Sequence, residues 1–319
     1  MAQLANVFST YDNTGIREDL ANIIENISPT DTPFMSAIGR TTATQTNHEW
    51  MTDTLAAASD TNAAIEGDES TIAAATGPRR LGNRTQISTK VVHTTTTNDW
   101  VSKAGRPGTE LAYRIEKAGK ELKRDMEAIL SRNKPLAVGS DAAARTLASF
   151  ETWIQTNDSR GATGADAANT NGQPDAAAAP TDGTQRPYTE DLLKTVLQSI
   201  FTNGGEPSIA IHGPTQKRVS STFTGNSTRM QNTAESNVLA TSYKVYESDW
   251  GQLTFVPSRF NRDRSVLILD PSKWALAIGE DFRMKPLAET GLSNKRLMWI
   301  EYTLQANNEA SSGIVADLS

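Results

Sequence analysis

The chain has 319 residues, of which 37% are hydrophobic and 6% aromatic, and it carries a formal net charge of −6. This apolar content is low for a compact enzyme of this length, so either much of the chain is extended or apolar surface is shared between copies. The acidic balance argues against a general nucleic-acid binder, the lack of cysteine excludes disulfides and thiolate metal sites, and no apolar run reaches the ~20 residues of a membrane span.

The N-terminal segment predicts an amphipathic helix followed by a break. It has no basic region ahead of an apolar stretch, so no signal peptide is predicted. Between residues 13 and 28, apolar side chains recur at steps of three and four, namely at Ile16, Leu20, Ile23 and Ile27. Pro29 ends this helix because proline disfavours the helical conformation at the residue before it. A second apolar group, PFMSAI at 33–38, follows, and nothing nearby in sequence offers either group a core.

Residues 46–93 predict two polar strands around a long tip. The stretches TNHEWMTDTL and NRTQISTKVV, at 46–55 and 83–92, are rich in strand-forming residues. Two strands of ten residues would reach about 33 Å at roughly 3.3 Å per residue. An isolated two-stranded arm is marginally stable in water, so we expect it to lie on another body.

The strongest helix signal follows. Thr109 is a suitable N-cap, and Glu110 lies in the first turn. The apolar stripe consists of Leu111, Ile115, Ala118, Leu122, Met126 and Ile129. Residues 101–135 hold nine Lys or Arg against five Asp or Glu. That excess fits either a face toward packaged nucleic acid or a solvated helix with paired charges, and the interleaved signs favour the second.

The second half of the chain predicts an α+β block. The Ala/Gly/Asp/Asn-rich tract 157–187 is expected to be a long loop. A helix over 189–202, a strand in SIAIHG, a helix in PTQKRVSSTF and a hairpin turning at 249–251 follow. RSVLILD predicts a central buried strand, and residues 295–308 form a run that is long for a single strand.

No catalytic or metal-binding motif emerges. The histidines are His48, His93 and His212, and we expect the first two on the partner strands of the arm as ordinary strand residues. HEWMT at 48–52 lacks the second histidine of a zinc-protease helix, and no G-x-S-x-G, phosphate loop or G-x-G-x-x-G occurs. We therefore predict no enzyme activity, no cofactor and no metal.

The order of these parts resembles the major capsid proteins of tailed bacteriophages with the Hong Kong 97 fold, and most closely the SU10-like branch. GIREDLANIIENISPTDTPFMSAIG resembles that family's N-terminal signature, and LQSIFTNGGEPSIAIHGPTQKRVSSTFTG resembles its central block. VYESDWGQLTFVPSRFNRDRSVLILDPSKWALA and IEYTLQANNEASSGIVADL resemble its C-terminal half. The resemblance covers almost the whole chain.

The resemblance implies a division of the chain into the family's parts. These are an N-terminal arm at 1–45, an extended loop at 46–95, a peripheral domain at 96–187 with its spine helix at 107–133 and the loop 157–187, an axial domain at 188–290, and a returning strand with the C-terminus at 291–319. The arm would pack on neighbouring subunits through Ile16, Leu20, Ile23, Ile27, Pro33, Phe34 and Ile38. The spine helix would bury Leu111, Ile115, Leu122 and Met126, and would leave Arg114, Lys117, Lys120 and Arg124 solvated or facing the shell interior.

The resemblance also implies function and partners. The chain would assemble into hexamers and pentamers of an icosahedral head around double-stranded DNA, in the host bacterial cytoplasm, and end in the virion. A separate scaffolding protein, a portal and a decoration protein are implied partners, with weak non-specific DNA contact and no membrane. Two alternatives stay open: an encapsulin-type compartment shell, and a soluble α+β hydrolase with a buried acid near His212.

Overall fold

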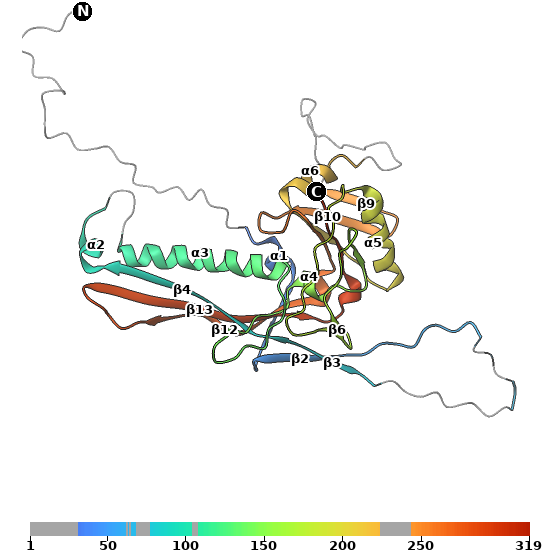
Figure 1. The fold of residues 1–319 in the computed structure, drawn as a ribbon, viewed down its shortest axis with the longest axis horizontal. Coiled ribbons are helices and arrows are strands. Elements are labelled where there is room, and N and C mark those ends of the chain that lie inside the picture. Colours follow the sequence, from blue (N-terminus) through green and yellow to red (C-terminus); the bar gives the residue numbers. More distant parts are fainter. Residues whose placement is uncertain (1–30, 62, 64, 68–76, 104–107, 224–243) are drawn as a thin grey trace, which may run out of the picture.

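We describe a computed structural model of the chain, covering residues 31–61, 63, 65–67, 77–103, 108–223 and 244–319. The predicted helix at 13–28, with Ile16, Leu20, Ile23 and Ile27, lies outside the described residues. Helices and two principal sheets share the described part of the chain, which confirms the predicted α+β class (Figure 1).

A four-stranded sheet and the long helix α3 (Glu110–Ser131) form the elongated half of the molecule (Figure 1). The strand order is β1 (Gly39–Thr42), β12 (Trp274–Pro286), β13 (Ser293–Ala306) and β4 (Gln86–Thr95). Only β1 pairs in parallel. The short helix α2 (Thr96–Trp100) follows β4 at the end of this sheet that is farthest from the other half.

A six-stranded sheet forms the compact half. Its order is β5 (Asp158–Ser159), β14 (Gly313–Val315), β11 (Val266–Leu269), β8 (Ile209–His212), β10 (Gly251–Pro257) and β9 (Val245–Ser248). The helices here are α5 (Glu190–Thr202) and α6 (Pro214–Ser220). Smaller elements are α1 (Pro33–Ala37), α4 (Phe150–Trp153), the hairpin β6 (Asn169–Thr170) with β7 (Gln173–Pro174), and 3₁₀ turns at Pro271–Lys273 and Glu309–Ser311.

Strand β11 joins the two halves because both of its faces are buried. Val266 and Ile268 point into the cluster formed by α5, whereas Leu267 and Leu269 point into the cluster that holds the end of α3 and the four-stranded sheet. All four residues are fully buried. A continuous apolar run is what a strand covered on both faces requires, and the predicted central strand is confirmed.

Helix α3 follows its predicted pattern. The Thr109 hydroxyl accepts a hydrogen bond from the Ala112 amide at 3.3 Å, which caps the first turn. Leu122 and Met126 are fully buried in the core, whereas Leu111 and Ile115, nearer the exposed end, are half-buried. The helix lies mainly over β4 and β13, and the Lys90 ammonium of β4 pairs with Asp125 at 2.8 Å.

The predicted pairing of the arm strands is wrong. Strand β2 (Asn47–Thr52) pairs with β3 (Arg79–Arg84), and the residues after Thr85 pair with β13 instead. Only Thr85 separates β3 from β4, so the local sequence predicts one continuous strand. In the structure the chain changes its strand partner at this residue, from β2 to β13. His48 and His93 therefore lie on strands that do not pair with each other.

Long-range pairing also differs from the predicted segment boundaries. Strand β12, expected in the axial block, belongs to the four-stranded sheet, as do β1 from the expected arm and β4 from the expected loop. The C-terminal β14 and the short β5 complete the six-stranded sheet. The tract 157–187 is irregular, as predicted, but it is held to the body, for example by the Ala177 amide donating to the Leu136 carbonyl at 2.6 Å. The periodicity of apolar residues indicates which side of a strand is buried, but it does not indicate which other strand it pairs with.

Truncating the core face of α3 should destabilise the subunit far more than truncating its solvent face. Leu122→Ala leaves a cavity and should lower the free energy of unfolding by roughly 2–5 kcal/mol. Lys117→Ala removes only an exposed pair with Glu121 and should change it by less than about 1 kcal/mol. Urea unfolding of the two variants tests this, and equal losses would refute the assigned face.

Candidate assembly site

The histidines do not form a catalytic group. The His48 Nε2 atom lies 2.9 Å from the Gln305 side-chain oxygen, and His93 pairs in register with Lys295 at the exposed edge strand β4. His212 is fully buried, and its ring contacts the Ala210 carbonyl at 3.1 Å and the Tyr188 hydroxyl at 3.4 Å. Burial lowers the pKa of His212 to about 3, so the ring is neutral.

The buried acid that a hydrolase would need beside His212 is not among its contacts in the described part of the chain. Within the same residues no group of three or more His, Asp or Glu side chains is placed to hold a metal. None of the helices described is long and apolar enough to cross a bilayer.

The root of the N-terminal arm packs within its own subunit, which corrects the prediction for Phe34 and Ile38. Both side chains are buried in the core around α3, where Phe34 meets the Phe150 ring edge-on at 5.6 Å. Pro33, the first residue of α1, is half-buried. A strand after α1, β1, continues this attachment by pairing with β12. Side chains that are buried in their own subunit cannot contact a neighbour, so the predicted intermolecular role does not hold for Phe34 and Ile38.

Glu127 of α3 fixes this root. Its two carboxylate oxygens accept hydrogen bonds from the backbone amides of Phe34 and Met35 at 2.8 and 2.9 Å. The side chain is fully buried and forms no ion pair with a described residue. Burial raises the pKa of Glu127 to about 7, and the two amides only partly oppose that rise.

The root of the β2–β3 hairpin is also locked to the body. The Trp50 indole donates to the Ala306 carbonyl at 2.8 Å, and the buried Asn83 amide donates to the Leu304 carbonyl at 2.8 Å. The Arg145 guanidinium donates to the Thr85 carbonyl at 2.9 Å and pairs with Glu301. The hairpin therefore leaves the sheet in one fixed direction.

The described residues of the hairpin beyond this root form no core of their own. The described residues among 53–61, 63, 65–67 and 77–78 form neither helix nor strand, and Leu55 is 98% exposed. Residues 53–78 contain five acidic residues and no Lys or Arg. An exposed, acidic extension with a rigid root is suited to contact a second body.

The sheet face opposite α3 offers a matching surface. Side chains alternate along a strand, and Lys90 of β4 points to α3, so Ile87 and Val91 point away from it. Leu297 and Trp299 of β13 lie in register beside Val91 and Thr89 on the same outer face. Residues at the rim of this outer face are His93, Arg283, Lys285 and Lys295.

The predicted basic face of α3 is mostly neutralised. Arg114 pairs with Glu110 at 2.7 Å, Lys120 with Glu116 at 2.7 Å, and Lys117 with Glu121 at 3.9 Å. Arg124 instead lies over the Phe260 ring, 5.5 Å from its centroid. These pairs agree with a solvated helix.

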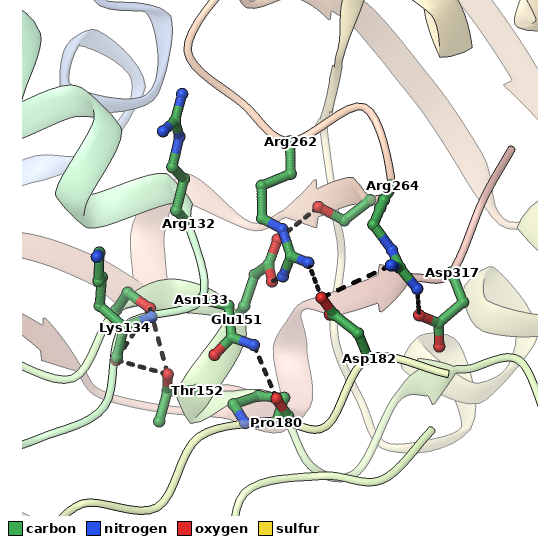
Figure 2. Close-up of polar contacts among 12 residues, drawn as sticks. Arg132, Asn133, Lys134, Glu151, Thr152, Pro180, Asp182, Arg262, Arg264 and Asp317 are labelled. Carbon is green, nitrogen blue, oxygen red and sulfur yellow. Dashed lines mark hydrogen bonds and ion pairs between the residues drawn. The ribbon is translucent and has the colours of Figure 1, made fainter. Parts of the chain in front are cut away.

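A charge network around the buried Glu151 joins the two halves of the subunit (Figure 2). Glu151 of α4, fully buried, accepts from the Arg262 guanidinium at 2.9 Å and from the Ser265 hydroxyl at 2.5 Å. Figure 2 shows Arg262 placed between Glu151 and Asp182 of the irregular tract, to which it also bonds. Burial raises the pKa of Glu151 despite Arg262, which makes the carboxylate dependent on that partner.

Asp317 extends the network to the C-terminus. Its carboxylate accepts from the Arg264 guanidinium at 2.9 Å and from the backbone amides of Gly161 and Gly183 at 3.0 and 2.8 Å. A Cβ atom at Gly183 would lie 2.8 Å from that carboxylate and 2.5 Å from the Gly164 nitrogen, so only glycine fits there. The tract 157–187 is thus pinned between the C-terminus and the loop before β11.

Sequence reasoning missed Glu127, Asn83, Glu151 and Asp317. Glu127 left one signal, because it is a charged residue directly beside the apolar stripe of α3 and close to its buried end. Asn83, Glu151 and Asp317 gave none, because each is satisfied by groups at least 53 positions away in sequence.

Comparison with known proteins defines the class. The profile of the SU10 major capsid protein family matches residues 4–319. The major capsid protein of Escherichia phage Phieco32 is 28% identical over 343 residues, covering 97% of this chain and 96% of that protein. Among solved structures, a chain of Gordonia phage Cozz superposes with a TM-score of 0.61 at 11% identity, covering 99% and 97% of the two chains. A chain from the capsid of a native GTA particle gives 0.63 at 10%, covering 97% and 98%.

The fold is therefore that of the Hong Kong 97-like capsid proteins. Fold alone does not exclude the compartment alternative, because the SrpI encapsulin of Synechococcus elongatus PCC 7942 also superposes, with a TM-score of 0.54 at 10% identity over 96% and 93% of the chains. The family match decides between them: the chain belongs to the SU10 major capsid protein family, and it is the major capsid protein of a tailed phage.

Removing Arg262 should cost more than removing a neighbouring surface arginine. Arg262→Met leaves the buried Glu151 carboxylate unpaired and should lower the free energy of unfolding by about 3–5 kcal/mol. Arg259→Met, three residues away and exposed, should change it by about 0.5 kcal/mol or less. Chemical denaturation of both variants measures the difference, and a loss shared by both would show that the network contributes nothing.

Glu127 should make subunit stability depend on pH. Its pKa is about 7 folded and near 4.5 unfolded, so the folded state binds the extra proton between these values. Stability is therefore full below about pH 4.5 and falls by roughly 3 kcal/mol as the pH rises through 7. Glu127→Gln cannot ionise, so the difference in unfolding free energy between wild type and variant should decline over pH 5–8. Parallel pH profiles would contradict this assignment.

Proposed function

We propose that this chain assembles into the hexamers and pentamers of an icosahedral head that encloses double-stranded DNA, and that it acts by assembly without catalysis. The observation that carries this proposal is the β2–β3 hairpin, an extension with a rigid root, an acidic tip and described residues that are exposed and form no core. A marginal hairpin of this kind needs a second body to become ordered.

The second body is the outer sheet face of a neighbouring copy. That face carries an apolar strip of Ile87, Val91, Leu297 and Trp299 with basic residues at its rim, and the tip supplies five acidic residues. Opposite charges steer and orient such contacts more than they strengthen them. The six-stranded sheet with α5 and α6 would then form the axial domain around the capsomer axis.

The remaining partners follow from this role. Assembly would take place in the host bacterial cytoplasm with a separate scaffolding protein, and the finished head would hold a portal and accept a decoration protein. Packaged DNA would meet α3 only weakly, because Arg114, Lys117 and Lys120 are already paired with carboxylates of the same helix.

Hydrogen exchange before and after assembly tests the hairpin contact. In the unassembled subunit, amides of residues 53–61 should exchange freely, whereas those of β4 should be protected because β4 pairs with β13. Assembly into shells should slow exchange at 53–61 and leave β4 unchanged. A tip that is protected in the isolated subunit, or still unprotected in the shell, would rule out the proposed contact.

A charge variant gives a matched test. Changing Asp53, Asp60 and Glu66 to Asn, Asn and Gln should slow shell formation several-fold at low salt, as scored by electron microscopy. Asp141→Asn, which neutralises an exposed carboxylate in another loop, should leave the rate unchanged. Equal rates for both variants would remove the electrostatic part of the proposal.

A further inference from the structure

An exposed apolar strip lies beside α3 on strand β12. Strand β1 pairs with β12 only at residues 275–278, so within the described part of the chain residues 280–286 form a free edge of the four-stranded sheet. α3 lies mainly over β13 and β4 and leaves this edge open. Phe282 is 37% exposed and Met284 is 49% exposed. Met284 pairs in register with Met298, which faces Gly119 of α3, so Met284 lies on the α3 side of the sheet.

The strip lies on the same side of α3 as helix α1. Residues 120, 123 and 127 lie on one side of a helix because they are three and four positions apart. Glu127 binds the amides of Phe34 and Met35, and the Lys123 ammonium lies 5.8 Å from the centroid of the Phe282 ring. Helix α1 therefore occupies one end of this side of α3, and the β12 strip lies further along it.

We propose that residues 13–28 of the same chain dock as an amphipathic helix on this strip, with Ile16, Leu20, Ile23 and Ile27 against Phe282 and Met284. The chain reaches it easily. Lys123 lies four residues before Glu127, about 6 Å along the axis of α3. The five residues 29–33 can span up to about 17 Å. A helix over 13–28 would be about 24 Å long, which matches α3 from Glu127 back to Leu111.

The charges of the two surfaces are complementary. Residues 13–28 contain Glu18, Asp19 and Glu25 against a single Arg17. Lys123 borders the strip on the α3 side of the sheet, and it is not ion-paired to a carboxylate in the described part of the chain. In a helix, Asp19 would lie directly beside the apolar stripe, where it could meet Lys123, and the net negative charge of the segment favours the same docking. In this arrangement the apolar stripe of residues 13–28 contacts its own subunit and not a neighbouring one. The proposal therefore does not depend on shell assembly.

Disulfide trapping tests the proposal in a chain that has no cysteine. Met284→Cys is combined in turn with Ile16→Cys, Leu20→Cys, Ile23→Cys and Ile27→Cys in the full-length subunit, because only correctly spaced pairs can bond. At least one pair should oxidise within a single chain, seen as loss of both thiols by mass spectrometry at monomer mobility. Shells, if they form, should show the same bond.

Ile87→Cys is the matched control. Ile87 is exposed to the same 49% as Met284 but lies on the opposite face of the same sheet. The same four partners should leave it free. Cross-linked dimers would mean that a second copy supplies the helix, and would overturn the proposal. So would equal trapping by Ile87→Cys, or no bond with Met284→Cys in any of the four pairs.

Discussion

Strand β13 is the constraint on which the rest of the subunit depends. It pairs with β12 on one side and with β4 on the other, and its inward side chains, from Met298 to Ala306, form much of the core beneath α3. The same strand ends in the carbonyls of Leu304 and Ala306, which accept from Asn83 and Trp50. One strand thus positions the long helix, the shared core and the origin of the hairpin.

Buried polar groups set the geometry around that strand. The Glu127 carboxylate holds α1 against α3, and the Glu151–Arg262–Asp182 network joins the irregular tract to the loop before β11 (Figure 2). Buried charges add little net stability compared with apolar residues of the same shape, but removing one partner is costly. Their effect here is to permit one arrangement of segments that have little regular secondary structure.

Local patterns in the sequence predicted much of the fold. The apolar period and Thr109 gave α3, the run at 266–269 gave the central strand, and the segment at 249–251 gave the turn between β9 and β10. The sequence did not predict which strands pair, because β3 and β4 form one continuous strand-like stretch that changes its strand partner at Thr85. Phe34 illustrates a related limit of sequence-based prediction. No apolar partner lies near it in sequence, and in the structure its ring packs against Phe150, 116 positions later. The polar contacts of Asn83 and Asp317 form only when segments distant in sequence come together, so the spacing of residues along the chain could not predict them.

The direct continuation of β3 into β4 has a mechanical consequence. A load on the hairpin, directed along its strands, passes through Thr85 into β4, whose ten residue pairs with β13 lie along the direction of pull. Such a load shears the ladder, so the hydrogen bonds share the force and must fail together instead of opening one by one. Internal pressure on a closed container pulls its units apart tangentially. In such a container, the backbone ladder of β4 and β13 would share that tension with the side-chain contacts of Trp50 and Asn83 at the hairpin root.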